Sequence, residues 1–193
     1  DNTTGEENVS IGAHSMDDNE TGSRNVAVGY KALRENTDGE DNVAIGHSAL
    51  LENTDGEDNV AIGAYALLEN IDGDYNIAIG YSALLENIDG DYNIAIGAAA
   101  LANNTEGDDN TAIGDDALVS ITTGDENIGI GYSALGSSEY GESNIAIGYQ
   151  ALSSATDTNS STIISNNTVI GQYALSDLGT INETVGLGTS LGD

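Results

Sequence analysis

The sequence predicts an all-β protein, a parallel β-solenoid (β-roll) of about eleven 17-residue coils. Three observations favour this fold class. Asparagine recurs every 17 residues, glycine follows it four residues later, and short apolar segments lie at fixed distances from both. A repeat architecture buries its core one layer at a time, so a chain in which only 38% of the residues are hydrophobic can still fold.

The repeats are counted from this asparagine, which is position one, and they follow the consensus N-[VI]-A-I-G-x-x-A-L-x-x-N-T-D-G-[ED]-[DY]. They begin at Asn8, Asn25, Asn42, Asn59, Asn76, Asn93, Asn110, Asn127, Asn144, Asn167 and Thr184. Every interval is 17 residues except that from Asn144 to Asn167, which is 23. We therefore expect one solenoid domain over residues 1–193, with a six-residue loop insertion within the Ser/Thr/Asn-rich residues 153–166.

Each coil is expected to contain one short strand and two corners. At positions two to four, Val or Ile alternates with Ala, and this period of two predicts a strand with its β-branched side chains turned inward. Glycine at position five predicts a corner that needs positive φ or close backbone approach. Ala-Leu at positions eight and nine supplies a second apolar edge, and Asn-Thr-Asp-Gly at positions twelve to fifteen is typical of turns. A helix over A-L-L-E-N is disfavoured because five residues between two corners cannot nucleate one.

Asparagine at position one is expected to form a structural amide ladder along the stack, because identical side chains then lie one above another. This ladder comprises Asn25, Asn42, Asn59, Asn76, Asn93 and Asn110. A second column at position twelve comprises Asn19, Asn36, Asn53, Asn70, Asn87 and Asn104. Turn preference alone is the alternative explanation for part of these asparagines.

The block N-x-A-I-G-x-x-A, found at residues 42–49 and 76–83, resembles the head repeat of trimeric autotransporter adhesins, the YadA-like left-handed parallel β-roll. Related repeats occur in bacterial and phage fibre proteins, and the likeness extends over nearly the entire chain. The resemblance implies a cell-surface or fibre protein that is trimeric and acts in attachment.

Two functions are expected, and neither is enzymatic. Residues 184–193 fill positions one to ten and residues 1–7 fill positions eleven to seventeen, so the termini together complete one coil. This favours an extracellular or cell-surface structural protein that forms a fibre by head-to-tail stacking, or one unit of a longer array. The alternative is the head domain of a trimeric cell-surface adhesin. A trimeric head should bury a lateral apolar face, whereas a stacking fibre should place its main contact at the coil ends.

The net charge of the chain limits the classes of molecule that it can bind. There are 33 acidic and three basic residues, which gives a net charge of -30. Such a chain repels nucleic acids and anionic membranes, and no apolar run approaches the length of a membrane span. The expected partners are copies of the chain itself, with glycans or cell-surface ligands as further candidates.

Carboxylates gather at the second corner of each coil. Because Ca²⁺ prefers several oxygen ligands, these residues are candidate calcium ligands, and a solvated acidic face is the alternative. The candidates are Asp38, Glu40, Asp41, Asp55, Glu57, Asp58, Asp72, Asp74, Asp89, Asp91, Glu106, Asp108 and Asp109. No other cofactor is expected.

The remaining candidate functional residues are the histidines, the tyrosines and the asparagines of glycosylation motifs. His14 and His47 occupy different repeat positions, which favours structural or surface roles over catalysis. Tyr30, Tyr81, Tyr132 and Tyr149 share position six, and Tyr75 and Tyr92 share position seventeen; such columns can bind sugars or simply pack as ladders. The sequence N-x-[ST] makes the following asparagines possible glycosylation sites: Asn2, Asn8, Asn19, Asn103, Asn159, Asn166 and Asn182.

Overall fold

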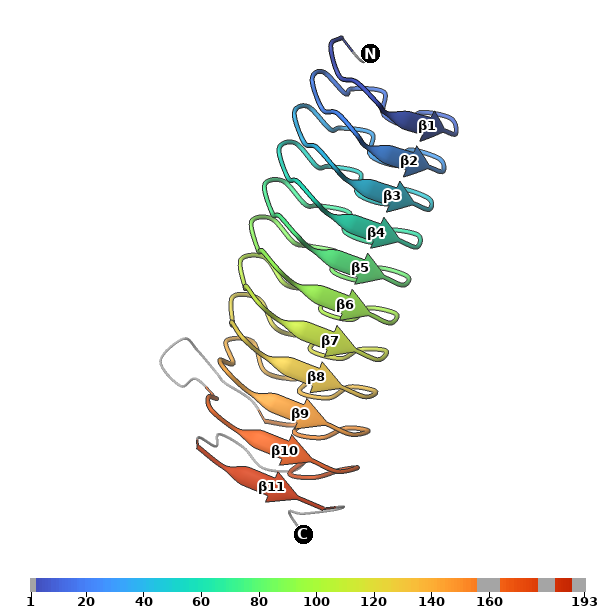
Figure 1. The fold of residues 1–193 in the computed structure, drawn as a ribbon. Coiled ribbons are helices and arrows are strands. Elements are labelled where there is room, and N and C mark those ends of the chain that lie inside the picture. The colour runs from blue at the N-terminus through green and yellow to red at the C-terminus, as the bar shows by residue number, and fades with distance from the viewer. Residues whose placement is uncertain (1–2, 156–163, 177–182, 189–193) are drawn as a thin grey trace.

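The fold is a β-solenoid, described by a computed structural model over residues 3–155, 164–176 and 183–188. Eleven strands stack in a single parallel sheet in the order of the sequence (Figure 1). They are β1 Val9–Ile11, β2 Val26–Val28, β3 Val43–Ile45, β4 Val60–Ile62, β5 Ile77–Ile79, β6 Ile94–Ile96, β7 Thr111–Ile113, β8 Ile128–Ile130, β9 Ile145–Ile147, β10 Thr168–Ile170 and β11 Val185–Leu187. The predicted fold class is confirmed, and the described residues contain no helix.

The register of the sheet follows the repeat. Each strand pairs with the next so that equivalent repeat positions are opposite one another, as in Val43 with Val60. Between β9 and β10 the same register spans the longer interval, and Ile145 pairs with Thr168. The register of the sheet is therefore the same on both sides of the 23-residue interval. The inserted loop remains a prediction, because residues 156–163 lie outside the described part of the chain.

Glycine at position five forms the first corner, and the prediction made for it is confirmed. Gly63 has a φ of 137°, in the region that side chains disfavour. A Cβ atom placed on Gly63 would lie 2.3 Å from the carbonyl oxygen of Gly80 in the next coil. Both the backbone conformation and the closeness of adjacent coils therefore require glycine.

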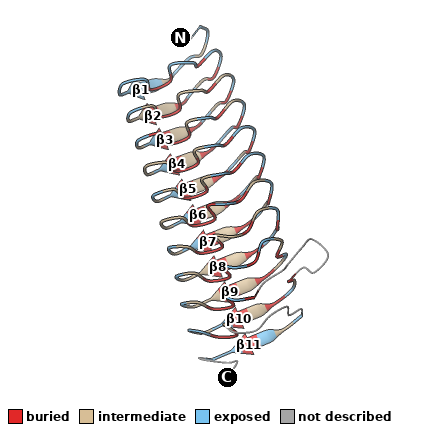
Figure 2. Ribbon diagram, turned by 180° about the vertical axis from the view of Figure 1, so that it is seen from behind, coloured by how far each residue is buried: buried red, intermediate tan, exposed pale blue. Residues whose placement is uncertain are grey.

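The core is narrow and consists mainly of alanine and leucine. Ala44, Ala49 and Leu50 are fully buried, and so are the corresponding residues of most other coils. In Figure 2 the buried segments recur at the same places in successive coils. The predicted second apolar edge at positions eight and nine thus forms the wall of the core that lies opposite the strands.

The prediction that the β-branched strand residues turn inward is wrong. Ala44 at the centre of β3 is buried, whereas Val43 is half-buried and Ile45 is 39% exposed. Leucine limits the space at the inward position: in β8, a Cβ atom on Gly129 would lie 2.8 Å from Cδ2 of Leu118. The inward position holds Ser, Ala or Gly in every described strand except β10, where Val169 is fully buried, and the larger residues on either side point outward.

Positions seven, nine and seventeen of the coil adopt left-handed backbone conformations without glycine. Examples are Tyr65, Leu67 and Tyr75, with φ of 61°, 51° and 57°. The conformation directs backbone N–H groups along the axis: Leu67 N donates to the carbonyl of Ala83 in the next coil, and Tyr65 N to that of His47 in the previous one. None of the described non-glycine residues with positive φ is Val, Ile or Thr, as expected from the steric cost of β-branching there.

Candidate functional surfaces

The outer face of the sheet is lined by two columns of side chains, at positions two and four of each coil, which we call the sheet face. Its members are Val9, Ile11, Val26, Val28, Val43, Ile45, Val60, Ile62, Ile77, Ile79, Ile94, Ile96, Thr111, Ile113, Ile128, Ile130, Ile145, Ile147, Thr168, Ile170, Val185 and Leu187. All of them are half-buried or exposed. Continuous exposed apolar surface of this kind usually marks a site of association.

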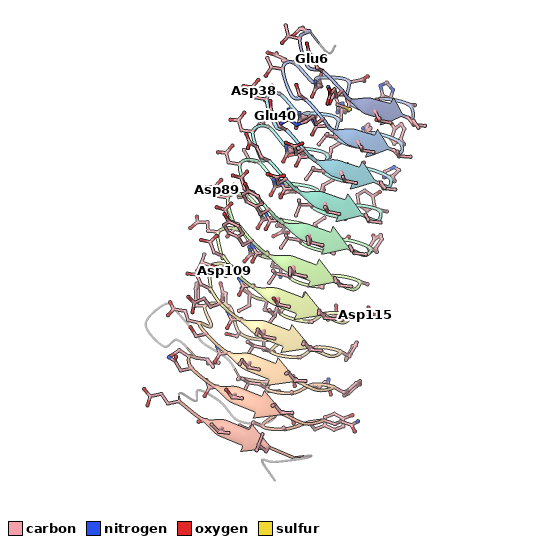
Figure 3. All side chains as sticks on the ribbon, viewed as in Figure 1. Glu6, Asp38, Glu40, Asp89, Asp109 and Asp115 are labelled. Carbon is pink, nitrogen blue, oxygen red and sulfur yellow. The ribbon has the colours of Figure 1, made fainter. Side chains whose placement is uncertain are left out.

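The sheet face contains no charged residue, whereas the chain as a whole carries a net charge of -30. The carboxylates lie on either side of it. In Figure 3, Glu6, Asp38, Glu40, Asp89 and Asp109 project along one edge of the solenoid, and Asp115 projects from the opposite edge. The strands therefore form an uncharged stripe beside the acidic corner. On the opposite edge, at positions six and seven of the coil, the described carboxylates are Asp115 and Asp116.

The acidic corner comprises positions fourteen to seventeen. At position sixteen, aspartates in adjacent coils form a ladder with the backbone: Asp74 Oδ1 accepts from Glu57 N at 2.7 Å. Asp91 and Asp108 accept in the same way from Asp74 N and Asp91 N, at 2.7 and 2.8 Å. The sequence did not predict this role. An aspartate that recurs in every coil gives the same sequence pattern whether its side chain accepts from a backbone N–H or faces solvent.

Stacking of carboxylates changes how readily they ionise. Burial raises the pKa of Asp74, opposed by the hydrogen bond from Glu57 N and assisted by the charge of Asp91. Partial desolvation and then the charges of Asp74 and Glu40 raise the pKa of Glu57. Asp74 and Glu57 therefore lose their protons less readily than the same groups in water, mainly because of burial.

The candidate calcium ligands are distributed along this corner rather than gathered at one point. Within the described residues, no group of three or more His, Cys, Asp or Glu side chains is placed to hold a metal ion. Two of the candidates instead pair with an arginine, since the Arg24 guanidinium bonds to Asp41 at 2.7 Å and also to Glu40. These hydrogen bonds lower the pKa of Asp41. Calcium binding remains a prediction.

The predicted asparagine ladders are both present, and the two ladders form hydrogen bonds with different groups. At position one, Asn42 Oδ1 accepts from the backbone N of Asn59 at 2.9 Å, and Asn42 Nδ2 donates to the carbonyl of Gly56. At position twelve the side chains bond directly to one another, with Asn70 Nδ2 donating to Asn53 Oδ1 at 2.8 Å. All the asparagines named for these two ladders are fully buried, so their role is structural.

Aromatic rings form a column at the corner that follows the strands. His14, Tyr30, His47, Tyr65 and Tyr81 are in sequential contact, with ring centroids 5.1 to 5.9 Å apart. The two histidines therefore belong to one stack although they occupy different repeat positions. Sequence reasoning separated positions six and seven, while the structure brings their rings together.

Other tyrosines form two further stacks. Tyr132, Tyr149 and Tyr173 continue the position six and seven column near the C-terminal end. Tyr75 and Tyr92 stack in parallel at the acidic corner, with centroids 5.0 Å apart. These contacts agree with ladder packing, and sugar binding remains a prediction.

The candidate glycosylation sites differ in accessibility. Asn19 is fully buried and Asn8 is half-buried, and the Nδ2 atoms of both donate to the carbonyl of Gly22. Asn103 and Asn166 are exposed. The remaining three candidates, Asn2, Asn159 and Asn182, lie outside the described residues.

Comparison with protein-family models, with curated proteins and with solved structures gives no match. The described residues also include no helix with the length and apolarity needed to cross a membrane. The class defined here is thus a β-solenoid repeat protein with an exposed aliphatic sheet face.

Proposed function

We propose that the chain is a non-enzymatic structural protein that assembles side by side with copies of itself through the sheet face, as the rod-shaped head of a trimeric cell-surface adhesin. In this proposal the acidic corner and the aromatic column remain on the outside of the assembly. The attached partner would be a glycan or another ligand at a cell surface.

The observation that carries the proposal is the uncharged, aliphatic sheet face on a strongly acidic chain. Association of two copies through any acidic surface would oppose carboxylates against carboxylates. Contact through the sheet face removes apolar side chains from water and leaves the acidic corner of each copy outside the contact. The same contact explains why Val and Ile occupy the outward positions of the strands, where a solvated sheet would favour polar residues.

Two further points support the details. The resemblance of the repeat block to trimeric adhesin heads supports three copies and an extracellular or cell-surface location. A structural role for the two histidines is supported by their ring contacts with tyrosines.

Head-to-tail stacking into a fibre remains a separate prediction. It depends on a coil shared between the two ends of the chain, and residues 1–2 and 189–193 lie outside the described part. The sheet face favours lateral association, which is the arrangement expected of an adhesin head.

The test is the mass of the protein in solution, measured by sedimentation equilibrium for the wild type and two double variants. Ile62→Glu with Ile96→Glu places charges on the sheet face. Ile71→Glu with Ile88→Glu is the matched control, because these isoleucines are equally exposed (38% and 37%, against 37% for each of the first pair) but lie at the second corner. We expect a trimeric mass for the wild type and the control, and a monomer for the sheet-face variant.

Circular dichroism should show that both variants keep their strands, so that loss of association is not loss of fold. A monomeric wild type, or equal dissociation of the two variants, would overturn the proposal. Electron microscopy of the same samples separates the alternatives. Long filaments that persist in the sheet-face variant would favour head-to-tail stacking instead.

A further inference from the structure

Two threonines interrupt the sheet face. Thr111 in β7 and Thr168 in β10 occupy position two, where the other strands have Val or Ile, and every other residue of the sheet face is aliphatic. Both threonines are half-buried within the single chain.

The hydroxyls of these threonines differ from those of the threonines at position thirteen. Thr37, Thr105 and Thr122 each donate their hydroxyl to a backbone carbonyl of the following coil, at 3.0 to 3.1 Å. The hydroxyls of Thr111 and Thr168 make no hydrogen bond to any described residue.

Their neighbours in the column offer no polar group. Thr111 is paired with Ile94 on one side and Ile128 on the other. A hydroxyl covered by a second sheet face therefore needs a partner from the molecule that covers it.

An aliphatic face alone does not fix the alignment of two copies. Its columns repeat in every coil, so sliding one copy by one coil, about 4.8 Å, recreates nearly the same contacts. A slipped copy would instead cover Thr111 with isoleucine and leave its hydroxyl without a partner. The threonines therefore distinguish one alignment from the others, as a single polar residue does in the apolar seam of a coiled coil.

The two threonine levels also distinguish parallel from antiparallel association. In a parallel, unshifted assembly, Thr111 and Thr168 each lie level with their counterparts, and all the described strands overlap. An antiparallel pair can place Thr111 level with Thr168 only at an offset that leaves β1 to β5 without a facing strand.

We infer that Thr111 and Thr168 are the residues that set the register of association, and that the partner of the sheet face is a further copy of this chain in parallel and unshifted alignment. The inference rests on the proposed lateral assembly and specifies how that assembly is aligned. The threonine hydroxyls of neighbouring copies would hydrogen-bond to one another at each of the two levels.

The experiment measures distances between spin labels on neighbouring copies. The chain contains no cysteine, so Ala13→Cys in the first coil provides a single labelling site at the exposed corner beside β1. Pulsed electron paramagnetic resonance should give one narrow, short distance distribution for the labelled protein. An antiparallel assembly would separate the labels by much of the rod, and slipped copies would add longer distances.

The variant Thr111→Val with Thr168→Val removes both hydroxyls while retaining residues that favour strands. We expect it to stay associated but to show additional distance populations. Thr105→Val with Thr122→Val is the control, because it removes two hydroxyls at the second corner, and it should keep the single narrow distribution.

Three results would contradict the inference or the lateral assembly on which it rests. A single narrow distribution in the Thr111→Val and Thr168→Val variant would overturn the register role. Long distances in an associated wild type would overturn parallel alignment. A sedimentation mass of one chain, without dipolar coupling, would instead refute the lateral assembly itself.

Discussion

The side-chain oxygen of Asn104 is buried one coil before Ile121 and has no hydrogen-bond partner within the described residues. In the preceding coils this oxygen accepts from the next asparagine, as Asn87 Oδ1 does from Asn104 Nδ2 at 2.8 Å. The position-twelve ladder therefore ends where isoleucine replaces asparagine.

The end of the ladder should be less costly to remove than its middle. Asn70→Ala breaks the bonds that Asn70 donates to Asn53 and Gly73, and it also removes one of the two acceptors of the Asn87 side-chain amide. Asn104→Ala breaks only the two bonds that Asn104 donates. We expect Asn70→Ala to lower the free energy of unfolding by about 1 kcal/mol more than Asn104→Ala, the value of one further buried hydrogen bond. Urea denaturation of both variants measures the difference, and equal values would contradict a continuous ladder.

Glycine at position five should be irreplaceable. Gly63→Ala combines an unfavourable φ with a Cβ atom too close to the Gly80 carbonyl, so we expect a loss of about 3 kcal/mol or more. Gly136→Ala is the comparison, because the nearest atom there is the mobile hydroxyl oxygen of Ser133. That variant should change stability by less than about 1 kcal/mol. Thermal unfolding of the two proteins checks both expectations.

The left-handed leucines should tolerate methionine but not isoleucine. Leu84 has a φ of 51°, and Met16 occupies the same repeat position with a φ of 52°. Leu84→Ile keeps the side-chain volume and adds β-branching, so we expect it to cost about 2 kcal/mol more than Leu84→Met. If isoleucine were as stable as methionine in chemical denaturation, backbone conformation would not explain the absence of β-branched residues in this column.

Mild acid should stabilise the protein. The pKa values of Glu52, Glu57 and Asp74 are raised, so these groups bind protons more readily in the folded state. Their contribution is complete below the unfolded pKa and is lost as pH rises through the folded pKa. Asp41 has a lowered pKa and acts in the opposite direction, but only below its ordinary value of 3.8. We therefore expect the Tm to rise as pH falls from about 7 to about 5 at constant ionic strength, and a falling Tm over that range would contradict the sign.

If calcium binds at the acidic corner, it should stabilise the fold more than the screening of carboxylate repulsion by salt does. We expect millimolar CaCl₂ to raise the Tm more than NaCl of equal ionic strength, because a divalent ion bridges carboxylates of adjacent coils. Asp74→Asn with Asp91→Asn should reduce that excess. Equal shifts in the two salts would assign the corner to a solvated acidic face.

The sequence was most informative where a residue has a single geometric reason to be present. The asparagine ladders, the Gly63 corner and the register across the insertion were all predicted from spacing. The face of the strand that points into the core was not predicted correctly. Alternation of Val43, Ala44 and Ile45 gives two faces, and which one is inside depends on how much space Leu50 and its equivalents leave. The sheet face was therefore missed as a candidate surface.

The left-handed positions were also missed, although a signal was present. Leu67 and Tyr65 are not residue types that indicate positive φ. Their columns lack Val, Ile and Thr in a chain that uses these residues freely elsewhere, and that omission reflects the backbone. The aromatic stack could not be found from repeat positions alone, because His14 and Tyr30 meet across neighbouring positions.

The contacts of Gly63 with Gly80 recur between the equivalent glycines of every pair of adjacent coils. Excision of residues 59–75 would join Asp58 to Asn76 and set Gly46 against Gly80, in the same relation as before. Gene duplication or recombination in multiples of 17 codons can thus lengthen or shorten the rod by about 4.8 Å per coil without a new fold having to evolve. A frame-preserving change of any other length would need to leave the register of the sheet unchanged, as the 23-residue interval between Asn144 and Asn167 does.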